Sequence, residues 1–93
     1  MNYKKINRIR KNLDLLDNKL LNLIKKRTML VNQILKQKKY KNQIVDRKRI
    51  NAILKNIRSK SVKKNIDPKI TNKIWKSMIN AFINYEYKNF KKK

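Results

Sequence analysis

The 93-residue chain contains no cysteine, no histidine and no glycine, and it has a single proline. Without cysteine and histidine it cannot form a disulfide framework, a Cys/His zinc site, a Ser-His-Asp triad or a Cys-His pair. Without glycine it has no P-loop and no Rossmann fingerprint, because both need glycine where the backbone approaches phosphate. The sequence also lacks an apolar run long enough for a signal peptide or a membrane span, so we expect a cytoplasmic protein.

Acidic residues are scarce as well. The chain has 5 Asp plus Glu against 28 Lys plus Arg, which gives a formal net charge of +23. A charge of this size favours nucleic acid or an anionic membrane surface as a partner. However, much of the chain consists of Lys, Asn and Ile, whose codons are rich in A and T, and the lysines occur on all polar faces. We therefore treat the total charge as weak evidence and expect neither a specific nucleic acid nor a membrane as partner.

The first part of the chain carries a heptad seam of apolar residues. Steps of three and four residues connect its members, which are Ile6, Ile9, Leu13, Leu16, Leu20, Leu23, Leu30 and Ile34. This pattern predicts one helix over about residues 4–39, which is roughly 54 Å long. A compact domain of this chain length has a radius of gyration of only about 12 Å. The rest of the chain is therefore too small to cover the seam, and we expect a homodimer.

Two further helices are predicted after a polar segment at residues 40–46. The second helix carries the apolar residues Ile50, Ile53, Leu54 and Ile57 and closes at residues 63–65. Asp67 and Pro68 favour a new helix start, with Asp as the cap and Pro at the first helical position. This third helix is expected to run to about Phe90. The predicted fold is all-α, with long, short and medium helices in a single domain spanning residues 1–93.

Two cations interrupt or extend the apolar seam. Arg27 occupies the missing seam position, and Lys38 follows eleven residues later. At 100° per residue the two differ by only about 20°, so they share a helix face about 16 Å apart and could bind a small dianion with a third cation. A polar register residue in a coiled coil is an equally good explanation of Arg27. For Lys38, the simpler explanation is a lysine side chain that is exposed to solvent and has no special role.

Two other charged residues have similar alternatives. Arg10 lies about 100° round the helix from Arg27, so the two can serve one site only across a dimer. A surface pair with Asp14 is the simpler explanation. Glu86, the only glutamate, lies on the apolar stripe of the third helix, where desolvation disfavours its charged form unless it is paired. It is either a functional carboxyl or the partner of an inward-facing Arg or Lys.

The spacing of these residues resembles a known family. The pattern consists of Arg10, Leu13, Asp17, Leu20, Leu21, Leu23, Ile24 and Arg27, followed by Lys38. It is similar to the first helix of the all-helical chorismate mutases and of the isochorismate pyruvate lyases that share their fold. The long-short-medium helix order agrees with this resemblance, which covers nearly the whole chain.

The resemblance implies an intertwined homodimer with two sites, each of which binds a cyclic dicarboxylate carrying an enolpyruvyl ether. Arg10 would reach the partner's site, and Arg27 and Arg49 would bind the substrate. Lys38 would donate to the ether oxygen and a carboxylate. Asp46 matches a family aspartate near the substrate, although an N-cap of the second helix explains it as well. The segment between Lys38 and Arg49 is one residue shorter than is usual in the family.

Glu86 takes the position at which bacterial members often have glutamine. Because a carboxyl group donates a hydrogen bond only when protonated, the resemblance implies that neutral Glu86 is the active form. Together with Lys38, it would stabilise the oxygen that gains negative charge as the ether bond breaks. The rearrangement of chorismate to prephenate is pericyclic, so no nucleophile, metal or cofactor is expected.

Two departures from the mutase pattern favour the lyase. Ile50 replaces a glutamate that commonly binds the ring hydroxyl in mutases, and the third helix ends in an aromatic-rich segment that includes Phe82, a candidate substrate-binding residue. Asp46 favours the mutase. We interpret the chain as a chorismate mutase. The alternative is an isochorismate pyruvate lyase, which forms salicylate and pyruvate, and a basic nucleic-acid-binding protein is the remoter one.

Overall fold

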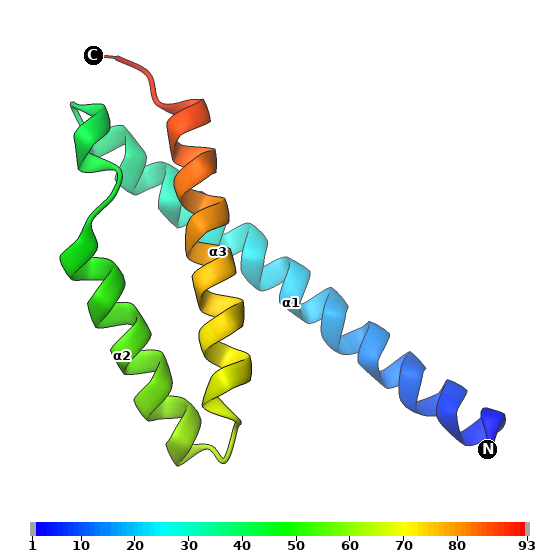
Figure 1. Ribbon diagram of the computed structural model, residues 1–93. Coiled ribbons are helices and arrows are strands. Elements are labelled where there is room, and N and C mark those ends of the chain that lie inside the picture. Colours follow the sequence, from blue (N-terminus) through cyan, green and yellow to red (C-terminus); the bar gives the residue numbers. More distant parts are fainter. Residues whose placement is uncertain (1, 93) are drawn as a thin grey trace. The chain divides into compact units, whose positions relative to one another are not determined.

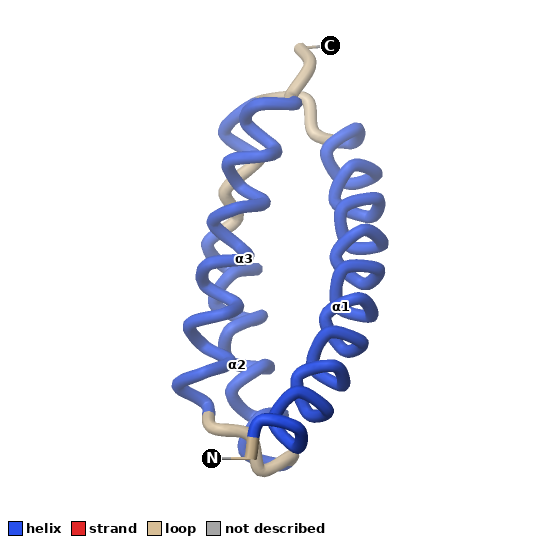
Figure 2. Tube along the Cα trace, turned by 90° about the vertical axis from the view of Figure 1, so that its right-hand side faces the viewer, coloured by secondary structure: helices blue, strands red, loops and turns tan. Residues whose placement is uncertain are grey.

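The computed structural model describes residues 2–92, in which every regular element is helical (Figures 1 and 2). Its elements are α1 (Tyr3–Gln37), the 3₁₀ helix η1 (Lys41–Gln43), α2 (Arg47–Lys63) and α3 (Pro68–Asn89). The predicted all-α fold with long, short and medium helices is confirmed. None of the described helices is long and apolar enough to cross a membrane.

The chain divides into two compact units, residues 1–30 and 31–93. The first unit holds most of α1, and its seam leucines are strongly exposed. Leu13, Leu16 and Leu20 each expose 53–54% of their surface, and Leu23 exposes 58%. The heptad seam predicted from the sequence is thus an exposed apolar stripe on this helix.

Helix α1 ends at Gln37, two residues earlier than predicted. The Gln43 side chain binds the backbone just after this end. Its Oε1 atom accepts the backbone N–H groups of Lys39 at 2.7 Å and Tyr40 at 2.9 Å. These two N–H groups therefore bond to a side chain instead of continuing the helical ladder. Gln43 belongs to η1, so the short 3₁₀ turn and the end of α1 stabilise each other.

A side-chain cap at the start of α3 and a backbone motif at the end of α2 define the turn between these helices. The Asp67 carboxylate accepts the Lys69 backbone N–H at 2.9 Å, and Pro68 follows at the first helical position of α3. At the end of α2, Asn65 has φ 59°, and the Ile66 N–H donates to the Ser61 carbonyl at 2.9 Å. This is a Schellman ending, in which asparagine takes the left-handed position that glycine fills in most proteins.

Helices α2 and α3 lie side by side and antiparallel in the second unit (Figure 1). Among the described residues, three apolar side chains are buried: Leu35, Ile44 and Ile79. The core of the second unit is therefore small. It is closed at the turn end by a polar contact, since Ser61 Oγ lies 2.7 Å from Thr71 Oγ1 and also donates to the Ile57 carbonyl at 2.6 Å.

This buried hydroxyl pair leads to a stability prediction. Ser61→Ala should lower the free energy of unfolding by about 1–2 kcal/mol, because it leaves the buried Thr71 hydroxyl with only its long 3.4 Å bond to the Pro68 carbonyl. The double variant S61A/T71V should lose less than the sum of the single variants, since no poorly bonded hydroxyl remains. Urea unfolding measures both effects. Ser59→Ala, at an exposed position of α2, is the matched control, and an equal effect at Ser59 and Ser61 would contradict the assignment.

Candidate functional site

Lys38 and Glu86 meet in the second unit as an ion pair. Lys38 follows the last turn of α1, where its backbone N–H donates to the Leu35 carbonyl at 3.1 Å. Its ammonium nitrogen lies 3.0 Å from Glu86 Oε2, and the two side chains are only 17% and 11% exposed. The ammonium also donates to the Ile44 carbonyl at 3.4 Å. The simple explanation of Lys38 as a solvated lysine is therefore wrong, and Glu86 has the inward-facing partner that the sequence left open.

This pair places opposite charges in a partly desolvated position beside the apolar stripe of α3. The Lys38 ammonium has three N–H donors, of which two point at Glu86 and the Ile44 carbonyl. The ammonium thus has one donor more than these two bonds use. Because both side chains are largely shielded from water, a bond from that donor to an anionic oxygen is stronger than the same bond in water.

A second polar contact joins α1 to α3 near this ion pair. Tyr85, the residue before Glu86, donates from its hydroxyl to Asn32 Oδ1 at 2.9 Å. The Tyr85 ring also packs edge-to-face on Phe82, with centroids 6.5 Å apart and an angle of 79° between the planes. Sequence reasoning identified Phe82 but missed Asn32 and Tyr85. The only available signal was a tyrosine in the aromatic-rich end of the third helix.

Asp46 and Arg49 lie together at the start of α2. The Asp46 carboxylate accepts the Arg49 backbone N–H at 3.0 Å, so Asp46 is the N-cap of this helix. The capping explanation of Asp46 is thus confirmed, and its role near a substrate stays a prediction. The Arg49 side chain is exposed.

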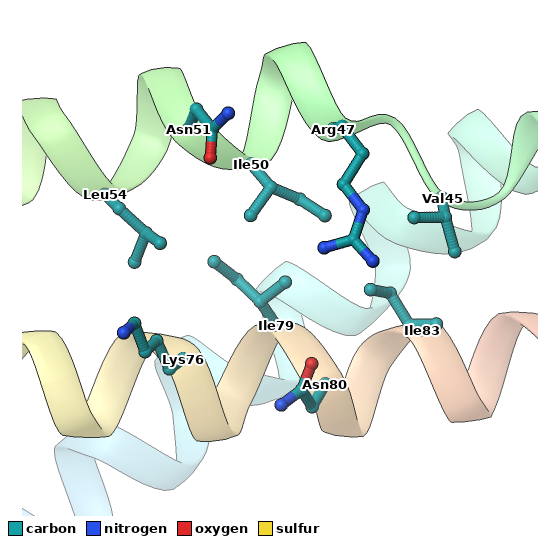
Figure 3. Close-up of a pocket in the computed structure, with 9 residues that line it drawn as sticks. All are labelled: Val45, Arg47, Ile50, Asn51, Leu54, Lys76, Ile79, Asn80 and Ile83. Carbon is teal, nitrogen blue, oxygen red and sulfur yellow. The ribbon is translucent and has the colours of Figure 1, made fainter.

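A groove of about 500 Å³ lies between α2 and α3 (Figure 3). Its floor is apolar, and its polar side chains come from two cations and two amides. The lining residues are Val45, Arg47, Ile50, Asn51, Leu54, Lys76, Ile79, Asn80 and Ile83. In Figure 3 the Arg47 guanidinium extends from α2 toward Ile83 on α3. Sequence reasoning chose Arg49 and missed Arg47, although Ile50 was identified. Such a groove suits an anionic molecule or segment with an apolar body.

Arg10 and Arg27 belong to the first unit. On α1, Arg10 is exposed and Arg27 is half-buried. The structure thus brings Lys38 and Glu86 into contact and places Phe82 one turn before Glu86 on α3. The contributions of Arg10 and Arg27 to a common site stay predictions.

Comparison with known proteins gives one match. The model of the family described as chorismate mutase type II matches residues 9–87. No curated protein and no solved structure matches the chain. The family match includes all of α2 and most of α1 and α3, together with Lys38 and Glu86.

Proposed function

The chain belongs to the chorismate mutase type II family, and on that premise we propose that it rearranges chorismate to prephenate in a cationic pocket containing Lys38. The supporting observation is the largely buried Lys38 side chain, whose ammonium nitrogen lies 3.0 Å from Glu86 Oε2. Both residues occupy positions that the resemblance assigns to stabilising the ether oxygen.

The proposed reaction is an isomerisation in which no atom is gained or lost. The ether C–O bond breaks while a C–C bond forms between the enolpyruvyl side chain and the ring, so no nucleophile takes part. A protein assists this step by holding the folded conformer of the substrate, and by donating hydrogen bonds to the oxygen that gains negative charge. In this proposal Arg27, Arg49 and the partner's Arg10 hold the carboxylates. Lys38 and Glu86 donate to the ether oxygen.

Glu86 must be protonated to act as a donor, yet the free chain pairs it with Lys38. A bound dianion resolves this conflict. Its oxygens compete with Glu86 for the Lys38 ammonium, and their negative charge disfavours a carboxylate nearby. We therefore propose that substrate binding is coupled to proton uptake at Glu86, and that the neutral side chain then turns its O–H toward the ether oxygen.

This proposal predicts the effect of two substitutions at Glu86. Glu86→Gln should retain most of kcat/KM, since an amide can donate the hydrogen bond without taking up a proton, whereas Glu86→Leu should lower it, because leucine has no donor. Steady-state kinetics on both variants beside the wild type measures the effect. Equal kcat/KM for E86Q and E86L would refute the role of Glu86.

The proposal includes a homodimer. The seam leucines of α1 are more than half exposed, and burying the remainder of each is worth about 1 kcal/mol. A second copy of the same helix supplies a matching apolar stripe. It would also bring the partner's Arg10 to the site, as the family resemblance implies. A single domain over residues 1–93 and a cytoplasmic location are further parts of this proposal.

An isochorismate pyruvate lyase is the second candidate. The observation in its favour is the aromatic pair Phe82 and Tyr85, which lies next to Glu86 on α3. In the lyase reaction the same ether bond breaks while a ring hydrogen moves to the enolpyruvyl methylene carbon, which gives salicylate and pyruvate. Incubating the protein separately with chorismate and isochorismate, and comparing kcat/KM for the two, decides between the candidates. A higher value for isochorismate would favour the lyase. Turnover of neither would reject both and favour a protein that keeps the family's scaffold without its chemistry.

A further inference from the structure

We propose that Tyr85 is a positioning residue, whose hydrogen bond to Asn32 holds the end of α1 on α3 and so places Lys38 for the reaction. This inference rests on the proposed function, because it concerns the same site. It assigns a role to two residues that do not belong to the predicted cage.

Two polar contacts connect α3 to the segment around the end of α1. Asn32 lies in the last two turns of α1, and Lys38 is the residue that directly follows its end at Gln37. Their partners, Tyr85 and Glu86, are consecutive in α3. A single contact would leave the end of α1 free to pivot, whereas two contacts at separate points fix its orientation. Leu35, which lies between Asn32 and Lys38, is buried and packs this segment in place.

The Tyr85 contact gains importance when a substrate binds. In the proposed reaction the Lys38 ammonium turns to the substrate, so its bond to Glu86 is weakened or lost. The other bond of the ammonium, to the Ile44 carbonyl, is long at 3.4 Å and therefore weak. The 2.9 Å bond between Tyr85 and Asn32 then remains as the strong polar contact between these two elements. It keeps Lys38 within reach of the ether oxygen at the time when Glu86 no longer does.

The hydroxyl of Tyr85 can be removed without disturbing the ring. Tyr85→Phe keeps the edge-to-face contact with Phe82 and deletes only the donor to Asn32. Asn32→Ala deletes the acceptor from the other side. If the shared hydrogen bond is what matters, each single variant has the same effect, and the double variant adds nothing further.

The test is steady-state kinetics on Y85F, N32A and Y85F/N32A. We expect kcat to fall about tenfold in all three, with KM nearly unchanged, because misplacing a donor weakens the transition state more than substrate binding. Ser61→Ala is the matched control, since it breaks a buried hydrogen bond at the opposite end of α2 and α3. Unchanged kcat in Y85F would overturn the proposal. So would an equal loss of kcat in S61A, which would indicate a merely structural role.

A second readout separates this proposal from the proposed function. If the wild type converts neither chorismate nor isochorismate, the proposed function is rejected. The positioning role is then tested by the chemical reactivity of the Lys38 ammonium. Limited acetylation followed by tandem mass spectrometry measures labelling at Lys38, with exposed Lys60 as the internal reference. Y85F should raise the relative labelling of Lys38 about threefold, because the end of α1 opens more often. An unchanged ratio would overturn the positioning role in that case.

Discussion

Replacing Lys38 with methionine is expected to lower kcat/KM for chorismate by about 10²–10³-fold, the usual loss when one donor to a developing oxyanion is removed. Methionine retains the length and the apolar stem of lysine but has no donor. Because the Lys38 ammonium is largely buried against Glu86, a solvent molecule cannot easily replace it. Lys39→Met is the matched control, since Lys39 is exposed and contacts Gln43 only through its backbone N–H. We expect the activity of K39M to equal that of the wild type.

The double variant K38M/E86Q separates catalysis from stability. In K38M the buried Glu86 loses its counter-charge, which should lower the free energy of unfolding by about 1–3 kcal/mol. Replacing Glu86 with glutamine removes the orphaned charge, so the double variant should recover most of that stability. It should not recover activity, because the ether oxygen still lacks the ammonium. Recovery of both in parallel would show that Lys38 acts only on stability.

Replacing Leu20 with lysine is expected to raise the dissociation constant of the dimer about a hundredfold or more, because each protomer loses apolar burial and gains an unpaired charge in the interface. Leu20 lies in the middle of the seam and is 54% exposed in the single chain. Activity should fall in parallel with the dimer fraction, because the proposed site requires the partner's Arg10. Sedimentation equilibrium and kinetics at the same protein concentrations measure both quantities.

Asn18→Lys is the control for this change, because it adds the same charge at an exposed polar position of α1, on the opposite side of the helix from Leu20. We expect N18K to remain dimeric and active. A fully active L20K monomer would contradict both the interface and the role of Arg10. A wild type that is active as a monomer would contradict them as well.

The helices were predictable from the sequence because their signals are local. The seam marks α1, and the caps Asp46 and Asp67 start α2 and α3 at the expected places. The end of α1 was predicted two residues too late. The helix ends earlier because the Gln43 side chain accepts hydrogen bonds from the N–H groups of Lys39 and Tyr40. The spacing of apolar residues carries no information about this polar contact.

The candidate site was predictable only in part. Glu86 stood out on its apolar stripe, and Lys38 was selected through the family resemblance. Their contact was not predictable, because it joins positions 48 residues apart and depends on tertiary packing. Asn32 gave no signal, because asparagine is abundant in this chain. Tyr85 gave only a weak one, because a tyrosine in an aromatic-rich helix end is usually a packing residue. Arg47 was passed over because Arg49 matches the family, whereas the groove between α2 and α3 is lined by Arg47.

The most direct test of the account is whether the purified wild-type protein converts chorismate to prephenate, with the product identified by proton NMR and K38M measured beside it. We predict that prephenate accumulates as chorismate is lost, and that K38M is slower by about 10²–10³-fold. Equal rates in the wild type and K38M, or no prephenate above the uncatalysed background, would contradict the central claim that Lys38 and Glu86 form the catalytic centre of a chorismate mutase.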